Sequence, residues 1–361
     1  MVLYGGRSGE HEISLRSAAS VIRYLDRTRF DVIPVGIDKK GVWRLGDFNL
    51  IEESLSNKLQ ESLVIYENAP VVVVGDFKSL AIDAVFPVMH GPLCEDGAIQ
   101  GLFELAEIPY VGSGVLGSAA GMDKDVSKRL ARDGGLKIVP YISLKRGRWQ
   151  GGSSVGDSDP ASGISASTSS GLSSGSFSKT PSDVPAGASV GSPEVFAEVS
   201  KQVVSQLGYP VFVKPANLGS SVGVHKVKES NGLRAALKDA FRYDTKVLIE
   251  KAINAREIEF AVLEASHYGD PAKVSLAGEI APTHEFYSYE AKYLDEQGAK
   301  LMIPAELEPK QMALGQKIAR EAFELIECEG MARVDLFLDK DSGEFYFNEV
   351  NTIPGFTSIS M

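Results

Sequence analysis

The chain has 361 residues, of which 43% are hydrophobic and 24% charged, as in folded globular proteins. This length exceeds one ordinary hydrophobic core, so we expect two or three domains. The net charge of −11 argues against a nucleic-acid partner, and no apolar stretch approaches the roughly 20 residues that cross a bilayer. The two cysteines, Cys94 and Cys328, give no disulfide framework and are typical of a reducing cytoplasm.

Short apolar segments alternate with helical patterns in the first third of the chain. Strands are predicted at 2–4, 32–37, 84–89 and 108–111, and helices at 14–25 and 98–106. This alternation is typical of an open α/β sheet. The segment GGRSGEHEISL, 5–15, lies where the first strand ends and a helix begins, which is where such sheets bind ligands. Glu10 is placed to hold a substrate ammonium there, or else to complement the helix dipole.

A glycine pattern, Gly112-x-Gly114-x-x-Gly117, follows a predicted strand and precedes a helix. Its spacing is that of a dinucleotide-binding fingerprint. The following acidic residue, Asp133, falls within a helical segment and not at the end of a second strand. The glycines serve equally well as an interdomain turn, so a nicotinamide-dependent dehydrogenase is a distant alternative.

Residues 151–192 differ in kind, because Ser, Gly, Ala and Pro dominate them. Almost nothing in this segment can be buried, so we expect a flexible surface insertion. From residue 209 onward the pattern is rich in strands. Strands are predicted at 210–214, 222–227, 246–250, 257–263 and 274–280, and helices at 232–243 and 311–328. This order fits an antiparallel sheet with flanking helices, an α+β arrangement.

The segment VFVKPANLGSSVGVHKV, 211–227, predicts two strands that flank a loop of small residues. The backbone N–H groups of such a loop, with the hydroxyls of Ser220 and Ser221, can surround phosphate oxygens. Lys214 lies at the entrance, where its charge would meet the same phosphates. An ordinary flexible turn with a structural lysine is the alternative.

Two further segments allow two interpretations each. Glu250-Lys251 ends a predicted strand and either holds a purine edge or forms a surface ion pair. The segment YSYEAKYL, 287–294, packs three tyrosines around Glu290 and Lys292. It fits a lid that excludes water, or equally a well-packed crossing loop.

The segment ARVDLFLDKDSGEFYFNEVN, 332–351, predicts two strands joined by a tight turn at 341–343. Alternation places two sets of residues on one face, namely Arg333, Asp335 and Phe337, and Phe347, Glu349 and Asn351. The opposite face would bury Leu336, Leu338, Tyr346 and Val350. Folding at the turn brings Asp335 close to Glu349. Carboxylate and amide oxygens suit Mg²⁺, whereas a cross-strand ion pair that faces solvent is the alternative.

These segments in this order resemble the D-alanine–D-alanine ligases of the ATP-grasp superfamily. The landmarks are GGRSGEHEISL, MHGPLCEDGAIQG, PYVGSG, MDK, VKPANLGSSVG, IEKAINAREIEF, YEAKYL, ARVD and FNEVNTIPGFTS. The resemblance covers nearly the whole chain apart from residues 151 to about 200. It implies an α/β and α+β fold with three domains. The N-terminal α/β domain would span 1–113, and the central ATP-grasp subdomain would span 114–252 with an insertion at about 151–195. The C-terminal ATP-grasp subdomain would span 253–361 and end before the family's last helix.

The implied reaction is the ATP-dependent ligation of two D-alanine molecules through an acyl phosphate, for peptidoglycan precursors. The resemblance also implies Mg²⁺ or Mn²⁺, with two ions, a homodimer, a cytoplasmic location, and neither nucleic acid nor membrane insertion. The alternatives are a D-alanine–D-lactate or D-serine ligase, and a truncated ATP-binding protein without turnover. In this family, tyrosine at the position of Tyr293 favours D-alanine over D-lactate.

The resemblance implies roles for single residues. ATP would contact Lys124, Lys214, Ser220, Ser221, Glu250, Lys251, Glu257 and Lys292. The metal ligands would be Asp335, Glu349 and Asn351. Arg333 and the backbone N–H of Gly355 would stabilise the developing oxyanion. The substrates would meet Glu10, His90, Ser360 and the N–H of Met361, and Tyr293, hydrogen-bonded toward Ser220 and Glu10, would close the pocket.

Overall fold

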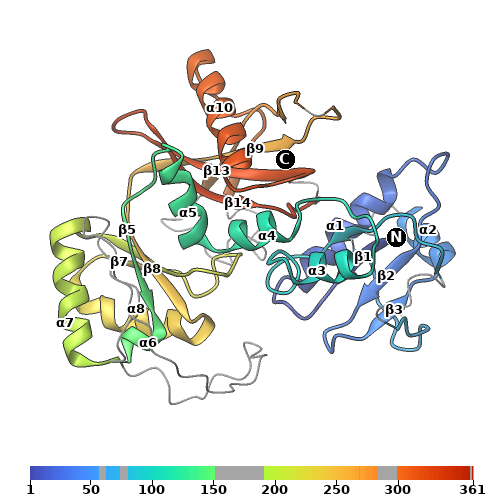
Figure 1. Ribbon diagram of the computed structural model, residues 1–361, viewed down its shortest axis with the longest axis horizontal. Helices are drawn as coiled ribbons and strands as arrows, with labels where there is room; N and C mark the ends of the chain where they lie inside the picture. The colour runs from blue at the N-terminus through green and yellow to red at the C-terminus, as the bar shows by residue number, and fades with distance from the viewer. Residues whose placement is uncertain are drawn as a thin grey trace, which may run out of the picture. The chain divides into compact units, whose positions relative to one another are not determined.

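The computed structural model of the chain separates into two compact units. It describes residues 1–56, 62–73, 80–150, 191–267, 269–282, 299–357 and 360. Unit 1 comprises residues 1–139, 217–221 and 253–361, and unit 2 comprises residues 140–216 and 222–252 (Figure 1). The three-domain division implied by the resemblance is finer than these two units and stays a prediction.

The N-terminal part of unit 1 is a sheet with strand order β3-β2-β1-β4. Its elements are β1 (Val2–Gly5), α1 (His11–Tyr24), β2 (Pro34–Ile37), β3 (Trp43–Leu45), α2 (Phe48–Ser56), β4 (Phe86–Val88) and α3 (Ala98–Leu105). Strand β1 runs parallel to β2 and β4, whereas β3 is antiparallel to β2. Because side chains alternate along β1, Val2 and Tyr4 pack with α1 and α2, and Leu3 packs with α3. The predicted open α/β sheet is confirmed.

Several predicted strands are shorter than expected, among them 222–227, of which only His225–Val227 forms a strand. Residues 108–111 form only an isolated bridge, between Tyr110 and Val85. The strand predicted at 274–280 is interrupted, and it forms β10 (Lys273–Val274) and β11 (Gly278–Pro282). The side chain of Ser275 explains the interruption, because its hydroxyl accepts from the N–H of Ala261 at 3.0 Å and donates to the carbonyl of Leu276 at 2.7 Å. Side-chain bonds of this kind compete with the backbone ladder.

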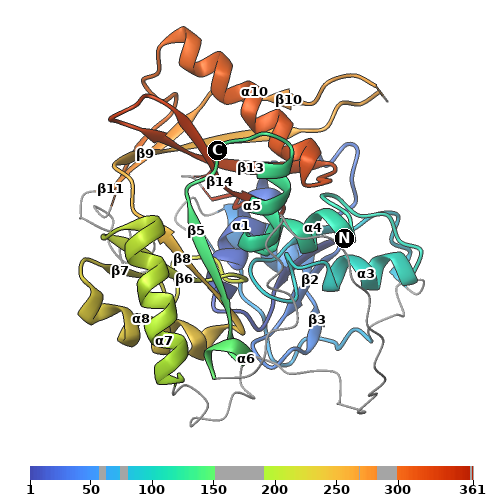
Figure 2. The ribbon, with the colours of Figure 1, turned by 60° about the vertical axis from the view of Figure 1, so that its left-hand side comes forward.

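The C-terminal part of unit 1 is a six-stranded sheet with the order β12-β11-β9-β13-β14, in which β10 also pairs with β9. Its other elements are α4 (Val115–Met122), α5 (Lys124–Asp133), β9 (Ala255–Leu263), β12 (Ala299–Met302), α10 (Pro309–Leu325), β13 (Met331–Asp339) and β14 (Phe345–Asn351). One face buries alternate apolar residues, among them Phe260 and Val334, in a core shared with α5 and α10. Figure 2 shows these two helices beside the sheet. Glu257 and Glu259 of β9 and Arg333 and Asp335 of β13 therefore project from the opposite face.

A β-bulge changes the alternation along β14. Asp335 pairs with Glu349, but the next residue, Leu336, pairs with Phe347, so Asn348 is an extra residue on β14. Phe347 is consequently buried in the core, and the prediction that it shares a face with Glu349 was wrong. Tyr346, predicted on the buried face, is only partly buried, for the same reason. The predicted turn at 341–343 and the close pairing of the two acids are confirmed.

The glycine pattern at 112–117 is explained by close packing. A Cβ atom on Gly117 would lie 2.3 Å from the carbonyl oxygen of Glu327, and one on Gly114 would lie 2.8 Å from Oε2 of Glu329. Gly112 adopts a φ of 112°, which favours glycine. The pattern thus follows from a turn and from the approach of α4 to its neighbours, and it needs no dinucleotide to explain it.

Unit 2 is built on a four-stranded antiparallel sheet with strand order β5-β8-β6-β7. Its elements are β5 (Tyr141–Lys145), α6 (Arg146–Trp149), α7 (Pro193–Gln202), the π-helical turn η3 (Val203–Leu207), β6 (Val211–Pro215), β7 (His225–Val227), α8 (Ser230–Tyr243) and β8 (Lys246–Lys251). Alternate residues of β6, Val211 and Val213, pack in a core with α7 and α8. The insertion predicted at 151–192 lies outside the described residues except for its last two, of which Ser192 caps α7.

Both cysteines are free and buried. Burial raises the pKa of the Cys94 thiol, and it raises the pKa of the Cys328 thiol to about 12. Neither thiol is therefore a ready nucleophile at neutral pH. None of the helices in the described parts of the chain combines the length and the apolar character that crossing a bilayer requires.

Candidate active site

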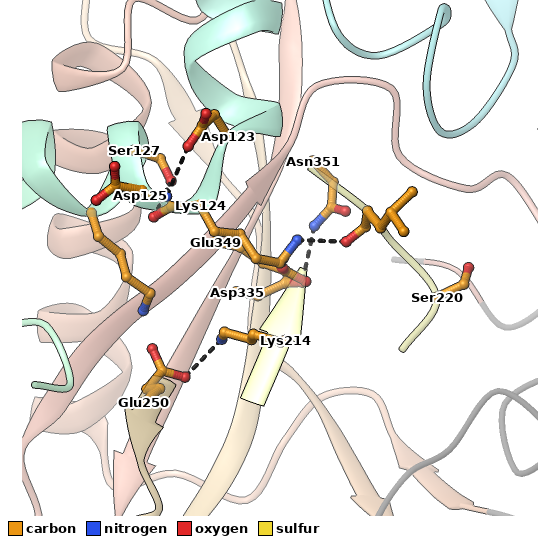
Figure 3. A network of polar contacts seen from close by, with 12 residues as sticks. Asp123, Lys124, Asp125, Ser127, Lys214, Ser220, Glu250, Asp335, Glu349 and Asn351 are labelled. Carbon is orange, nitrogen blue, oxygen red and sulfur yellow. Dashed lines mark hydrogen bonds and ion pairs between the residues drawn. The ribbon is translucent and has the colours of Figure 1, made fainter. Parts of the chain in front are cut away.

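The polar face of the six-stranded sheet gathers charged side chains from three neighbouring strands. Arg333 of β13 donates two hydrogen bonds to the carboxylate of Asp335, at 2.7 and 2.6 Å. Asn351 of β14 donates from Nδ2 to Oδ2 of Asp335 at 3.0 Å (Figure 3). Glu259 of β9 lies 3.4 Å from the Arg333 guanidinium. The alternation of the hairpin predicted the first three residues together, whereas sequence reasoning missed Glu259.

Arg333 is a permanent positive charge at the centre of these acids. Burial alone would lower the pKa of its guanidinium, but the carboxylates of Asp335 and Glu259 raise it well above its ordinary value. Asp335 and Glu259 are each only 9% exposed. Buried charges are costly unless paired, which explains why the acids and the guanidinium occur together. A planar guanidinium held in this way suits a carboxylate or an oxyanion ligand.

Lys124 meets the second acid of the hairpin. It follows Asp123, whose side chain caps α5 by accepting from the N–H groups of Asp125 and Val126. Its ammonium lies 3.1 Å from Oε2 of Glu349 and donates to the carbonyl of Leu218 at 2.8 Å (Figure 3). Burial tends to lower the pKa of Lys124, but the Glu349 carboxylate raises it above its usual value. The capped helix thus fixes a charged lysine beside the hairpin.

Glu10 contacts the loop of small residues that lies between β6 and β7 and contains Ser220. It precedes α1, but its side chain makes no capping bond to that helix. Instead, the hydroxyl of Ser220 donates to Oε1 of Glu10. Ser220 and Ser221 both adopt positive φ values, 53° and 58°, which non-glycine residues rarely adopt. Backbone strain of this kind is concentrated at ligand-binding loops, and the contact favours a ligand-facing role for Glu10 over the helix-dipole alternative.

A second carboxylate, Glu95, lies in the same region. It accepts a hydrogen bond from the N–H of Gly91 at 2.7 Å. Burial and the carboxylate of Glu10 together raise the pKa of Glu95 to about 8, against the hydrogen bond from Gly91 and the charges of Lys124 and Arg333. The sequence landmark MHGPLCEDGAIQG contains Glu95, but one acid in a loop gave no signal that could separate it from a surface residue.

The segment after β14 carries two further predicted site residues, Gly355 and Ser360. The hydroxyl of Ser360 accepts from the N–H of Thr357 at 3.0 Å. A Cβ atom on Gly355 would lie 3.1 Å from the same hydroxyl. The predicted oxyanion donor and the predicted carboxylate ligand therefore lie in one short turn.

Unit 2 contains a separate pair of predicted residues. Lys214 of β6 donates to Oε2 of Glu250 on β8 at 2.7 Å (Figure 3). The two residues are 8% and 3% exposed. Lys251 is exposed, and its backbone N–H bonds to the carbonyl of Pro140. The surface-pair alternative is therefore wrong for Glu250, because its charge is buried and paired.

The oxygen atoms of the hairpin suit a hard divalent cation. Asp335 pairs directly with Glu349, and Asn351 is within hydrogen-bond distance of Asp335. In the described parts of the chain, no group of three His, Cys, Asp or Glu residues is arranged to hold a metal alone. Mg²⁺ commonly uses one or two protein carboxylates and completes its shell with water and phosphate.

Some predicted residues cannot be placed with the others. Glu257 projects from the polar face of β9, two residues before Glu259. Lys292, Tyr293 and the backbone of Met361 lie outside the described residues. Their roles stay predictions.

Comparisons with known proteins identify the family. Residues 1–113 match the family described as D-ala D-ala ligase N-terminus, and residues 188–361 match D-ala D-ala ligase C-terminus. Over its full length the chain is 47% identical to D-alanine–D-alanine ligase A of Bradyrhizobium diazoefficiens and 43% identical to that of Chromobacterium violaceum, and it covers 88% and 87% of those proteins.

Solved structures give the same result. A D-Ala:D-Ser ligase from Enterococcus faecalis has a TM-score of 0.71 at 31% identity, with 100% of this chain and 91% of that chain covered. The D-alanine–D-alanine ligase from Coxiella burnetii has a TM-score of 0.71 at 30% identity, with 100% and 86% covered. The fold is that of the ATP-grasp ligases, as the sequence predicted. The chain belongs to the D-alanine–D-alanine ligase family, which excludes the dehydrogenase alternative.

Proposed function

We propose that the chain is an ATP-dependent enzyme that joins two D-alanine molecules into D-alanyl-D-alanine for peptidoglycan synthesis. The observation that carries this proposal is the pair of partly buried cations, Arg333 and Lys124, beside the acids of one sheet face. Such a site offsets negative charge as it develops on acyl and phosphoryl oxygens. The names of the full-length relatives support the choice of substrates.

The chemistry follows from the poor reactivity of a carboxylate. The carboxylate of the first D-alanine attacks the γ-phosphorus of ATP, which releases ADP and leaves an acyl phosphate. The amine of the second D-alanine attacks the acyl carbon, and the tetrahedral intermediate expels phosphate. Arg333 and the N–H of Gly355 would donate to its oxyanion, and each such donor is typically worth about 10²–10³ in rate.

The substrates would be oriented by groups that surround these donors. Glu10 would accept the ammonium of the first D-alanine while its contact with Ser220 holds the carboxylate in place. Ser360 and the N–H of Met361 would take the carboxylate of the second D-alanine. His90 would lie beside the substrates, and Tyr293 would close the pocket.

The resemblance assigns single residues to ATP and to its metal ions. Lys124, Lys214, Ser221 and Lys292 would face phosphates, whereas Glu250, Lys251 and Glu257 would face the adenosine. Asp335, Glu349 and Asn351 would hold Mg²⁺ or Mn²⁺, with two ions. The metal would neutralise phosphate charge when bound.

A second candidate is a ligase for D-alanine and D-serine. The likeness to the Enterococcus faecalis D-Ala:D-Ser ligase supports it. Because D-serine adds one hydroxyl to D-alanine, a polar group in the second-substrate pocket would decide the preference. The 42–47% identical relatives named D-alanine–D-alanine ligase favour the first candidate.

We also propose a cytoplasmic homodimer, since ATP is a cytoplasmic substrate. Four exposed apolar residues of the described chain support an interface at α3 and α4, namely Leu105, Val111, Val115 and Leu116, which are 89, 40, 41 and 67% exposed. Exposed apolar groups of this kind are typical of contact surfaces. Light scattering should give twice the chain mass, and Leu105→Glu with Leu116→Glu should give a monomer.

The test of the activity is phosphate release from ATP and Mg²⁺, with D-alanine, L-alanine, D-serine or D-lactate. We expect release with D-alanine only, together with the dipeptide detected by mass spectrometry. A mixed D-alanyl-D-serine product at equal concentrations would establish the second candidate. ATP binding without stimulated hydrolysis would contradict both.

A further inference from the structure

A buried serine of α1 connects the N-terminal sheet to the turn that carries Gly355. The hydroxyl of Ser17 accepts a hydrogen bond from the N–H of Phe356 at 3.1 Å and lies 3.2 Å from Nε2 of His90. The other ring nitrogen of His90, Nδ1, lies 3.1 Å from the carbonyl oxygen of Ile353. Ser17 is 0% and His90 5% exposed. Neither contact could be read from the sequence, because 73 and 339 positions separate Ser17 from its two partners.

The partners determine the direction of every bond in this chain of contacts. The carbonyl of Ile353 can only accept, so Nδ1 of His90 carries the proton and donates. A neutral ring then has an acceptor at Nε2, to which the Ser17 hydroxyl donates. Burial lowers the pKa of His90, and the charge of Arg333 adds to this effect. Glu10 and the Ile353 carbonyl act in the opposite direction but do not reverse the shift, so the ring is neutral at pH 7.

The two backbone contacts bracket Gly355. Ile353 is held through its carbonyl and Phe356 through its N–H, so only Pro354 and Gly355 lie between the fixed points. Proline fixes its own φ, which leaves little freedom for the direction of the Gly355 N–H. The ring of Phe356 also packs edge-on against Phe86, with centroids 5.5 Å apart. The turn is therefore anchored on both sides of the glycine.

We propose that Ser17 is a positioning residue, which acts through His90 and the backbone of Phe356 to aim the N–H of Gly355 at the oxyanion of the ligation reaction. The proposal rests on the proposed function and adds to it a residue that touches no substrate. An N–H donor stabilises an oxyanion only at a defined position, so a loosened turn lowers turnover without weakening ATP binding.

The test compares Ser17→Ala with Ser118→Ala. Ser118 is a matched control, because it is also 0% exposed in a helix and its hydroxyl makes one hydrogen bond, to the carbonyl of Ser113, away from the turn. We expect Ser17→Ala to lower kcat by about 10-fold or more, because the loosened turn weakens the stabilisation of the oxyanion by the Gly355 N–H. The KM for ATP should stay within about twofold. Ser118→Ala should keep kcat within about twofold. Equal kcat values for the two folded variants would overturn the proposal.

A spectroscopic measurement tests the link without relying on turnover. The chain has five histidines, so ¹⁵N-labelled imidazole signals can be assigned with His90→Asn. We expect His90 to be neutral and protonated at Nδ1 at pH 7, and Ser17→Ala to shift its Nε2 signal. A ring protonated at Nε2 would overturn the proposal. If the wild-type protein makes no dipeptide but shows the Nδ1 tautomer and its shift, the proposed function fails while the link from Ser17 to the turn stands.

Discussion

The sheets of the two units bury charge in opposite ways. In unit 2, one lysine meets one acid, Lys214 and Glu250, at 2.7 Å. In unit 1, two cations, Arg333 and Lys124, lie beside three acids, Asp335, Glu259 and Glu349. The pair in unit 2 is balanced in charge, whereas the surplus of carboxylates in unit 1 raises the pKa of both cations. The difference shows that one chain places a balanced ion pair in one sheet and a surplus of acids in the other.

The largest effect on stability is expected when the balanced pair of Lys214 and Glu250 is broken. Lys214→Met leaves the buried Glu250 charge without its lysine, and removing one partner of a buried pair costs about 3–5 kcal/mol. We expect the free energy of unfolding of unit 2 to fall by that amount, as measured by urea denaturation. The double variant Lys214→Met/Glu250→Gln should recover most of the loss, and a double variant no more stable than the single one would contradict the pairing.

Removing one acid from the surplus should affect turnover more than stability. Asp335→Asn takes away a carboxylate that pairs with Arg333 and that we propose as a metal ligand. We expect kcat for dipeptide formation to fall by about 10²–10³, since charge stabilisation at the reacting group is lost. Asp339→Asn, on the same strand but in the exposed turn, is the control and should keep kcat within about twofold.

The surplus of carboxylates in unit 1 also predicts that the stability of this unit depends on pH. The pKa of Glu95 is raised from 4.5 to about 8, so the folded protein keeps a proton that the unfolded chain releases. The stability that this group contributes is therefore present below pH 4.5 and is lost as the pH rises through about 8. The slope of unfolding free energy against pH reaches at most about 1.4 kcal/mol per unit. The measurement is urea denaturation between pH 6.5 and 8. Burial lowers the pKa of His90, so its opposite contribution to the slope fades as the pH rises across this range.

Glu95→Gln should flatten this slope, because an amide does not titrate. An unchanged slope in the variant would mean that another group of the protein titrates in this range, and would contradict the raised pKa that burial and Glu10 give to Glu95.

The smallest effect is expected from an exposed pair. Lys39 lies 2.6 Å from Glu12, but their side chains are 67% and 62% exposed. Solvent screens such pairs, so Glu12→Gln should change the unfolding free energy by at most about 0.5 kcal/mol. A loss as large as that of Lys214→Met would show that burial is not what separates the two kinds of pair.

The parts of the site that the sequence predicted are those that local periodicity controls. Arg333 and Asp335 were predicted on one face because they lie two apart on a strand. Glu259 was missed because its role depends on the register of β9 against β13, which no short pattern encodes. The contact between Ser17 and His90 was missed for the same reason, since it joins α1 to the loop after β4.

The fold was predicted to a similar depth. Helices and strands were found where hydrophobic alternation continues over several residues. The interruption at Ser275 and the bulge at Asn348 were not predicted, because each depends on one residue that alters the hydrogen bonds of a strand.

The bulge at Asn348 has a consequence for how this hairpin can vary. It allows Phe347 to face the core while Glu349 and Asn351 face the site, although these residues lie at even spacing. The number of residues between Phe347 and Glu349 therefore determines which side chains of β14 face the core and which face the site. Most substitutions at position 348 should be tolerated. A deletion of one residue would turn the acids into the core, so the hairpin can change its composition far more readily than its length.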